Sequence, residues 1–135
     1  MLRVLMLLLL CCAMPAFAAK PAPTAAVAAQ SELAGEYHLD GVMETGSGLR
    51  LNADGTFDWF FTYGALDLGA RGTWERTGDG VDLTVDEMGY PPQMPETQFK
   101  RMHLRLDGRD LVPTWPWDMD AFRKGAERGT YSRSE

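Results

Sequence analysis

The sequence predicts an all-β domain in which short strands run up and down in an antiparallel meander and close into a small barrel of about eight strands. Three observations predict this fold. Large apolar residues alternate with polar ones in short runs, turn residues separate these runs at intervals of roughly 9 to 12 residues, and no long stretch shows the periodicity of a helix. A closed meander leaves no strand edge unpaired.

The first segment, residues 1–19, has the features of a secretory signal peptide. Arg3 supplies a positive charge, an apolar stretch follows, and Ala16-Phe17-Ala18 has the small-x-small pattern of a cleavage site. The apolar stretch is too short to span a membrane. We therefore expect export to a periplasm or secretion, with no stable membrane insertion after cleavage.

The two cysteines, Cys11 and Cys12, both lie in this segment. The mature chain would contain none, which excludes a disulfide framework, a thiol nucleophile and a thiolate metal site. Leu9 and Leu10 before the cysteines do not match a lipoprotein signal, so we expect no lipid anchor.

Residues 20–31 are rich in Ala and Pro and predict a flexible leader. Residues 32–135 then form a single domain. Without Arg3, the chain has 12 basic and 19 acidic residues, which gives a formal net charge of 12 − 19 = −7. Such an acidic domain argues against nucleic acid and anionic lipid as partners.

A hairpin with one aromatic face forms the centre of the predicted barrel. Asn52-Ala53-Asp54-Gly55 supplies the turn, because Gly accepts a positive φ. Alternation places the same face inward in both strands, with Leu49, Leu51, Phe57, Trp59, Phe61 and Tyr63 on it. Phe60 is apolar on the outer face, where it marks a bulge, a partly covered position or a contact surface; the first two are the commoner explanations.

The other elements follow from the same patterns. In chain order we expect a strand at 35–43, a turn at 44–48, the hairpin, a loop at 64–69, and strands at 70–76, 81–85, 101–106, 109–112 and 129–133. Residues 115–128, before the last strand, are expected to form a short helix capped by Asp118 or a loop. Gly-Thr-aromatic begins at Gly55, Gly72 and Gly129, each time where a strand is expected to start.

Aromatic and aliphatic side chains are expected to fill most of such a barrel and to leave room for one small ligand near a mouth. The expected interior residues are Tyr37, Leu51, Phe57, Trp59, Phe61, Tyr63, Trp74, Leu83, Leu104 and Leu106.

Two irregular segments are the candidates for that mouth. Residues 86–97 contain three prolines within five residues, and long connections of this kind are often functional. The second segment is Trp115–Asp120. Together they supply the candidate ligand-binding residues Met88, Tyr90, Met94, Trp115 and Trp117. In the alternative interpretation, Trp115 and Trp117 plug the open end of the barrel.

The order of turn and core residues over 35–85 resembles small exported bacterial β-barrel domains. The matching pattern is Gly35-x-Tyr37, Leu49-x-Leu51-x-x-Asp54-Gly55-Thr56-Phe57, Gly72-x-Trp74 and Gly78-Asp79-x-Val81-x-Leu83. It is similar to the N-terminal domain of the copper-resistance lipoprotein family and, more distantly, to lipocalin-like domains. The resemblance implies a fold only, since the acylated cysteine and the Cys-x-x-Cys pair of that family have no counterpart in the mature chain.

No constellation of residues predicts catalysis, a metal or a cofactor. Methionine sulfur and histidine nitrogen could bind copper. We favour instead that the methionines fill space in the core and that the histidines face solvent. The residues concerned are Met88, Met94, Met102, His38 and His103. The paired carboxylates fall in turns and loops, and no nucleophile elbow or phosphate-binding loop is present.

The sequence therefore predicts a non-enzymatic exported module that binds a small or lipid-like ligand at the mouth. The alternative is a periplasmic protein-interaction module, such as an inhibitor or an envelope accessory factor, which requires an exposed patch at Phe60 and Pro91-Pro92. A hydrolase would require a His close to a Ser or Asp in a cleft.

Overall fold

The computed structural model describes residues 25–117 and 129–135. The signal peptide predicted at 1–19 lies outside the described residues, as do residues 118–128 of the helix or loop predicted at 115–128. The described elements are α1 (Ala25–Leu33), β1 (Gly35–Asp40), β2 (Thr45–Leu51), β3 (Thr56–Tyr63), β4 (Leu66–Thr77), β5 (Gly80–Gly89), the 3-10 turn η1 (Pro95–Thr97), β6 (Arg101–Asp107), β7 (Asp110–Thr114) and β8 (Thr130–Arg133).

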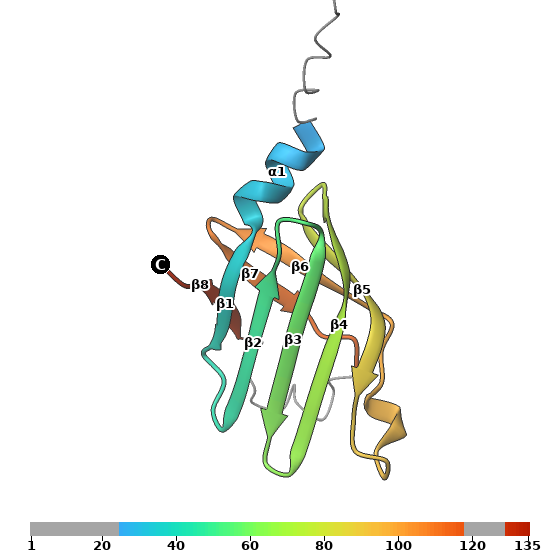
Figure 1. The fold of residues 1–135 in the computed structure, drawn as a ribbon. Helices are drawn as coiled ribbons and strands as arrows, with labels where there is room; N and C mark the ends of the chain where they lie inside the picture. The colour runs from blue at the N-terminus through green and yellow to red at the C-terminus, as the bar shows by residue number, and fades with distance from the viewer. Residues whose placement is uncertain (1–24, 118–128) are drawn as a thin grey trace, which may run out of the picture.

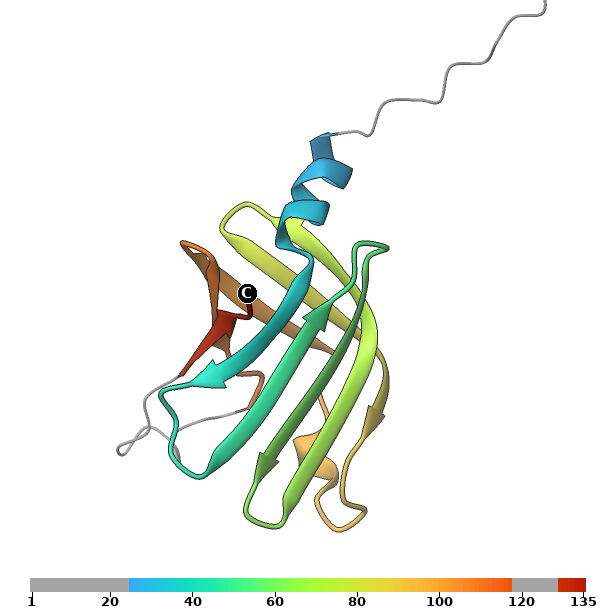
Figure 2. The ribbon, with the colours of Figure 1, turned by 60° about the vertical axis from the view of Figure 1, so that its left-hand side comes forward.

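The eight strands form one closed barrel in chain order, which confirms the predicted fold class (Figure 1). Each strand pairs antiparallel with the next, and β8 returns to pair with β1, as Figure 2 shows. Closure pairs the backbone N–H and C=O groups along the edges of the first and last strands.

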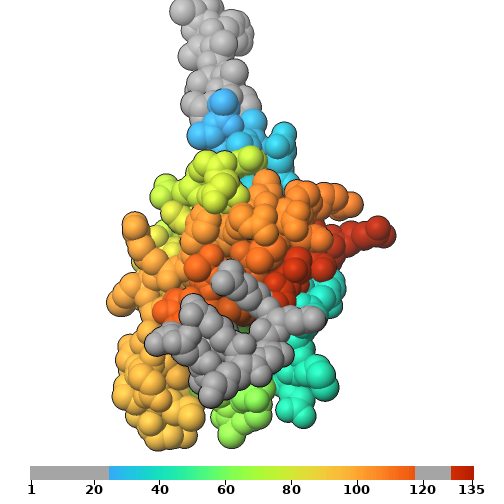
Figure 3. All heavy atoms as spheres, turned by 180° about the vertical axis from the view of Figure 1, so that it is seen from behind, coloured from blue at the N-terminus to red at the C-terminus, as the bar shows by residue number. Residues whose placement is uncertain are grey.

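The two ends of the barrel differ in their connections. At one end lie α1 and the tight turns that follow β2, β4 and β6 (Figure 1). At the other end lie the β1–β2 and β3–β4 turns, the 90–100 loop and residues 115–117. Seen from behind, the 90–100 loop and the β1–β2 turn border this second end on opposite sides (Figure 3). Residues 90–97 and 115–117, which belong to the two predicted mouth segments, therefore lie at the same end.

The lumen is filled by side chains from all eight strands. Its fully buried members include Tyr131, Phe57, Leu49, Leu83 and Leu104, each less than 2 % exposed. Nine of the ten predicted interior residues are buried in or packed against this core. Tyr63 was wrongly predicted, since it is 41 % exposed; it has the inward parity of β3 but is the last residue before the turn, where the barrel wall ends.

Helix α1 corrects the prediction of a flexible leader at 20–31, because its residues 25–31 are helical. Tertiary contacts hold its end on the barrel. Leu33 is buried, its carbonyl accepts a hydrogen bond of 2.7 Å from the Tyr37 hydroxyl, and the Arg133 guanidinium donates to the carbonyls of Glu32 and Ala34. Strand β8 thus caps the carbonyl groups that a helix end leaves unpaired.

Two predicted turns are shorter than expected. Residues 45–48, predicted as a turn, belong to β2, and residues 66–69, predicted as a loop, belong to β4. Glycines suggested a turn at each place, together with Ser47 at the first, but Gly48 and Gly69 are the direct cross-strand partners of Phe60 on either side. The pairing is regular at Phe60, so this position is not a bulge.

A register shift lies instead between Arg71 and Gly72 of β4, which pair with Glu87 and Val85, so Asp86 of β5 is the extra residue of the bulge. Gly72 is in the interior of the strand and not at its start, contrary to the Gly-Thr-aromatic expectation. A Cβ atom on Gly72 would stand 2.0 Å from the Thr84 carbonyl oxygen of β5. Only glycine allows the two backbones to approach this closely.

Candidate functional site

Six aromatic rings gather at the end of the barrel that carries the predicted mouth segments. We call them the aromatic rim: Trp59, Phe61, Phe99, Trp115, Trp117 and Tyr131. Neighbouring ring centroids are 5.3 to 6.3 Å apart. Trp115 and Trp117 stack on each other at 5.8 Å with an angle of 12° between their planes. These distances are those of direct aromatic packing.

The polar side-chain atoms on the inner side of the rim have hydrogen-bond partners within the barrel. The Trp59 Nε1–H donates to the Tyr131 hydroxyl at 2.8 Å, and this hydroxyl lies 2.6 Å from the Ser47 Oγ. Ser47 in turn donates to the Phe60 carbonyl oxygen at 2.5 Å. Because buried polar groups seek partners, this chain of bonds fixes the three side chains relative to one another.

Burial also sets the acidity of Tyr131. Desolvation of the phenolate raises the pKa of Tyr131 to about 12, against the smaller opposing effect of the bonds from Ser47 and Trp59. The hydroxyl therefore stays protonated near neutral pH, and Tyr131 is unsuited to act as a general base there.

We expect alkaline pH to weaken the fold through Tyr131. In the unfolded chain the phenol ionises near pH 10, whereas in the barrel its pKa is about 12. The contribution of this group to stability is thus complete below about pH 10, falls as the pH rises toward about 12, and amounts to about 3 kcal/mol. Urea unfolding at several alkaline pH values measures how steeply the free energy of unfolding falls with pH.

In that experiment Tyr131→Phe is the control, because it lacks the ionisable group. Burial raises the pKa of Tyr37 as well, so a smaller slope in the same direction should persist in this variant. Equal slopes in the variant and the natural chain would contradict the assignment.

One hydrogen bond joins the two predicted mouth segments, and a second contact closes the first segment on itself. The Trp117 Nε1–H donates to the Thr97 carbonyl oxygen of η1 at 2.7 Å. The Phe99 backbone N–H points at the Met88 sulfur at 3.4 Å. Residues 86–97 and 115–117 are therefore held against each other by the Trp117–Thr97 hydrogen bond.

The structure brings together four of the five predicted ligand-binding residues. Trp115 and Trp117 belong to the rim, and Met88 and Tyr90 are partly buried and pack against the same core. Met94 is 39 % exposed, and its carbonyl oxygen accepts the hydrogen bonds that form η1. Met94 therefore shapes the loop from outside the ring cluster.

Sequence reasoning missed Phe99 and Ser47 as members of this end of the barrel. Phe99 lies in an irregular stretch without periodicity, so no local signal marks it as inward. Ser47 was placed in a turn. Tyr131 was expected only as a residue of the last strand, and the hydrogen bonds that connect it to Trp59 depend on closure of the barrel.

The histidines lie on the outer surface, away from the rim. His103 Nδ1 is 2.5 Å from Asp82 Oδ1, and its Nε2 is 3.2 Å from Asp79 Oδ1. Within residues 25–117 and 129–135, no group of three or more His, Cys, Asp or Glu side chains could hold a metal ion. The two histidines thus take part in surface ion-pair and hydrogen-bond contacts.

One surface arrangement has the composition of a catalytic triad. His38 Nδ1 is 3.3 Å from Ser134 Oγ, and His38 Nε2 is 3.5 Å from Asp40 Oδ2. The side chains of His38 and Asp40 are 57 % and 56 % exposed. Catalytic acid–base groups need a sheltered site in which water does not screen them, so this arrangement does not support a hydrolase.

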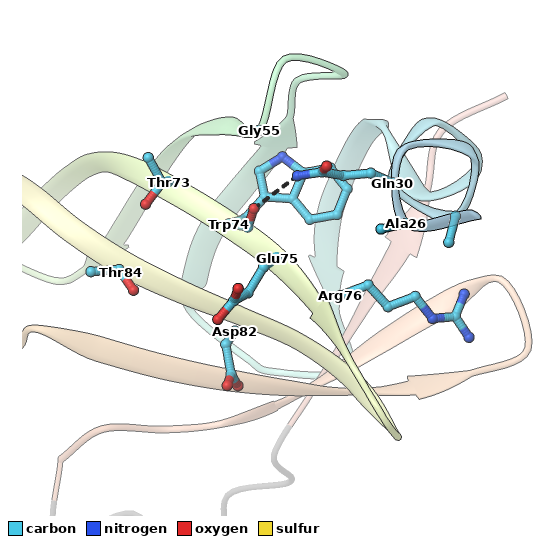
Figure 4. A pocket seen from close by; sticks show the side chains of 10 residues that line it. Ala26, Gln30, Gly55, Thr73, Trp74, Glu75, Arg76, Asp82 and Thr84 are labelled. Carbon is cyan, nitrogen blue, oxygen red and sulfur yellow. Dashed lines mark hydrogen bonds between the residues drawn. The ribbon is translucent and has the colours of Figure 1, made fainter. Parts of the chain in front are cut away.

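A groove of about 570 Å³ separates α1 from the outer face of β4 and β5 (Figure 4). Gln30 of α1 donates to the Trp74 carbonyl oxygen at 3.0 Å across it. Glu75 and Asp82 line it as direct cross-strand neighbours, a pairing of like charges that is unfavourable by itself. The Asp82 carboxylate is engaged by His103, which offsets part of this repulsion.

No helix in the described part of the chain is both long and apolar enough to cross a membrane. No family model matches the sequence, and no curated protein or solved structure is significantly similar to it. The resemblance to the copper-resistance lipoprotein domain and to lipocalin-like domains stays a prediction from the sequence.

Proposed function

We propose that this chain is exported and acts as a non-enzymatic binding module of the cell envelope, which takes a small apolar or lipid-like molecule at its aromatic rim. The observation that carries this proposal is the stacked pair Trp115 and Trp117. Both side chains are only partly buried, and both continue directly into the ring cluster of the core.

The geometry supports a ligand at the rim more than one inside the lumen. The lumen is packed with side chains, so a ligand would have to lie against the outer parts of Trp115 and Trp117. Such a position removes apolar ring surface from water, which is the main favourable term for small apolar ligands.

The chemistry of the rim favours an apolar ligand. The indole N–H of Trp59 and that of Trp117 each have an acceptor within the protein, as does the Ser47 hydroxyl. A ligand with many polar groups would lose its water without gaining these partners. The rings therefore offer dispersion and apolar contact in preference to hydrogen bonds.

The test is a titration with the neutral apolar probe N-phenyl-1-naphthylamine, followed by competition with a long-chain fatty acid. We expect Trp115→Ala and Trp117→Ala to weaken probe binding at least about tenfold, which corresponds to about 1.4 kcal/mol. Val27→Ala is the matched control, because Val27 is an exposed apolar residue of α1 at the opposite end.

Two results would overturn the proposal. One is the absence of any saturable probe binding to the natural chain. The other is tighter binding by Trp115→Ala or Trp117→Ala than by the natural chain, because removal of a plug opens a cavity that apolar molecules fill. Thermal unfolding of each variant shows whether the barrel is intact.

A further inference from the structure

The outer face of β1 to β5, which faces the viewer in Figure 1, carries a row of alternating charges. Cross-strand pairing places five charged residues side by side, one on each strand: Glu36, Arg50, Asp58, Arg71 and Glu87. Arg50 pairs with Glu36, and the Arg71 Nε lies 3.1 Å from Glu87 Oε2. Along the row, carboxylates that accept hydrogen bonds alternate with guanidinium groups that donate them, and the net charge is small.

The adjacent row of the same face is almost bare of side chains. Direct cross-strand partners there are His38, Gly48, Phe60, Gly69 and Gly89. Phe60 is 52 % exposed. A Cβ atom on Gly48 would stand 2.5 Å from the Phe60 Cε1, so the ring lies over the glycine and keeps its other side toward solvent.

The missing side chains leave two grooves on this face. A groove of about 430 Å³ includes His38, Gly48 and Arg50 in its lining, and a second of about 520 Å³ includes Gly69, Arg71 and Gly89. Both grooves share Asp58 and Trp59 in their lining. We call these two grooves together the outer trough. They span five strands, the charged row lines both of them, and Phe60 lines the first.

We propose that the outer trough binds a neutral linear polysaccharide, with one sugar ring stacked on Phe60. An exposed aromatic ring offers an apolar face to the C–H groups of a sugar, and carboxylates and guanidinium groups accept from and donate to sugar hydroxyls. Neighbouring strands are about 4.8 Å apart, close to the length of one pyranose unit in an extended chain. Each charged residue of the row can therefore meet a successive sugar.

The charge pattern decides between a glycan and the other occupants of such a surface. Because each charge has an opposite neighbour, the row gives no strong attraction to an anionic or a cationic polymer. A second copy of the chain docked face to face, with its two-fold axis along the middle strand β3, would set Glu36 against Glu87 and Arg50 against Arg71. Such like-charge contacts oppose that dimer.

The experiment measures binding of the purified protein to soluble neutral polysaccharides, namely a β-glucan, a mannan and a dextran, by affinity gel electrophoresis. Oligosaccharides of two to about six sugar units are then titrated by calorimetry. We expect affinity to rise with length up to about five units, one for each strand crossed, and to change little with salt, because the ligand carries no charge.

Phe60→Ala should weaken binding at least about tenfold, and Asp58→Ala should weaken it to a lesser degree. Met43→Ala is the control, since Met43 is an apolar side chain that is 86 % exposed and does not line the trough. All three substitutions are on the surface, and circular dichroism confirms the barrel in each. The proposal does not depend on the aromatic rim, which is tested with a different probe.

Three outcomes would overturn it: no binding to any of the neutral polysaccharides, equal affinity of Phe60→Ala and the natural chain, or binding only to charged polymers with a steep dependence on salt. Self-association of the natural chain that Phe60→Ala abolishes, without glycan binding, would assign the surface to a second copy. Capture of a partner protein through Phe60 without glycan binding would assign it to the protein-interaction alternative.

Discussion

Gly80→Ala is expected to lower the free energy of unfolding by about 3 kcal/mol or more, the cost of forcing extra volume into a packed site. A Cβ atom at this position would stand 1.9 Å from the Leu104 carbonyl oxygen and 2.9 Å from the Arg105 Cα. Both obstacles are backbone of the neighbouring strand β6, so neither can rotate away. The substitution should therefore loosen the pairing of β5 with β6.

Gly78→Ala, in the same turn, is the matched control. No atom lies within 4 Å of a Cβ built at Gly78, and an exposed substitution of this kind changes stability by less than about 0.5 kcal/mol. Urea unfolding followed by circular dichroism compares the two variants. If Gly80→Ala proves as stable as Gly78→Ala, the close approach of β5 and β6 described above is incorrect.

Tyr131→Ala is expected to cost about 3 to 5 kcal/mol, the range for removal of a large buried aromatic side chain. This is a large fraction of the stability of a small domain, about 5 to 15 kcal/mol. The ring is fully buried in the short strand β8, and its hydroxyl lies between Trp59 and Ser47. Without it, β8 loses its main contact with the core, and β1 and β7 lose the strand that closes the barrel.

Tyr131→Phe separates the hydroxyl from the ring. It keeps the buried area but leaves the Trp59 N–H without its acceptor, which should cost about 1 to 3 kcal/mol. Adding Trp59→Phe removes the N–H group that has lost its acceptor. The effects of the two substitutions on the free energy of unfolding should therefore not add in a double-mutant cycle.

Equal stability of Tyr131→Phe and the natural chain would contradict the hydrogen-bonded arrangement of Trp59, Tyr131 and Ser47. Near-ultraviolet circular dichroism provides a second measurement, because a fixed indole beside a fixed phenol gives a strong signal. That signal should weaken in Tyr131→Phe and vanish in Tyr131→Ala if the barrel no longer closes.

Much of the fold could be predicted because the inward or outward position of a strand residue is a local property. Alternation alone placed Phe57, Trp59 and Phe61 inside and Phe60 outside, and Asp54-Gly55 located a turn. The prediction failed at glycine-rich stretches. At Gly48 and Gly69 the absent side chain makes room for Phe60 in a regular strand, and the local sequence does not distinguish this from a turn.

The candidate site was predictable in part. Two irregular segments rich in Met, Pro and aromatic residues indicated one end of the barrel, and the structure places Trp117 within hydrogen-bond distance of Thr97 there. Phe99 could not be predicted, since its inward position depends on the course of an irregular loop. Nor could helix α1, whose attachment depends on Arg133 at the other end of the chain.

The sequence by itself determined the class of fold, the order of the strands and the face on which most strand residues lie, because these follow from a period of two and from the conformations that turn residues allow. Only the tertiary structure decided the register between strands. Register joins Trp59 to Tyr131, aligns five charges across the outer face and closes β8 on β1, and it depends on contacts between residues far apart in the chain.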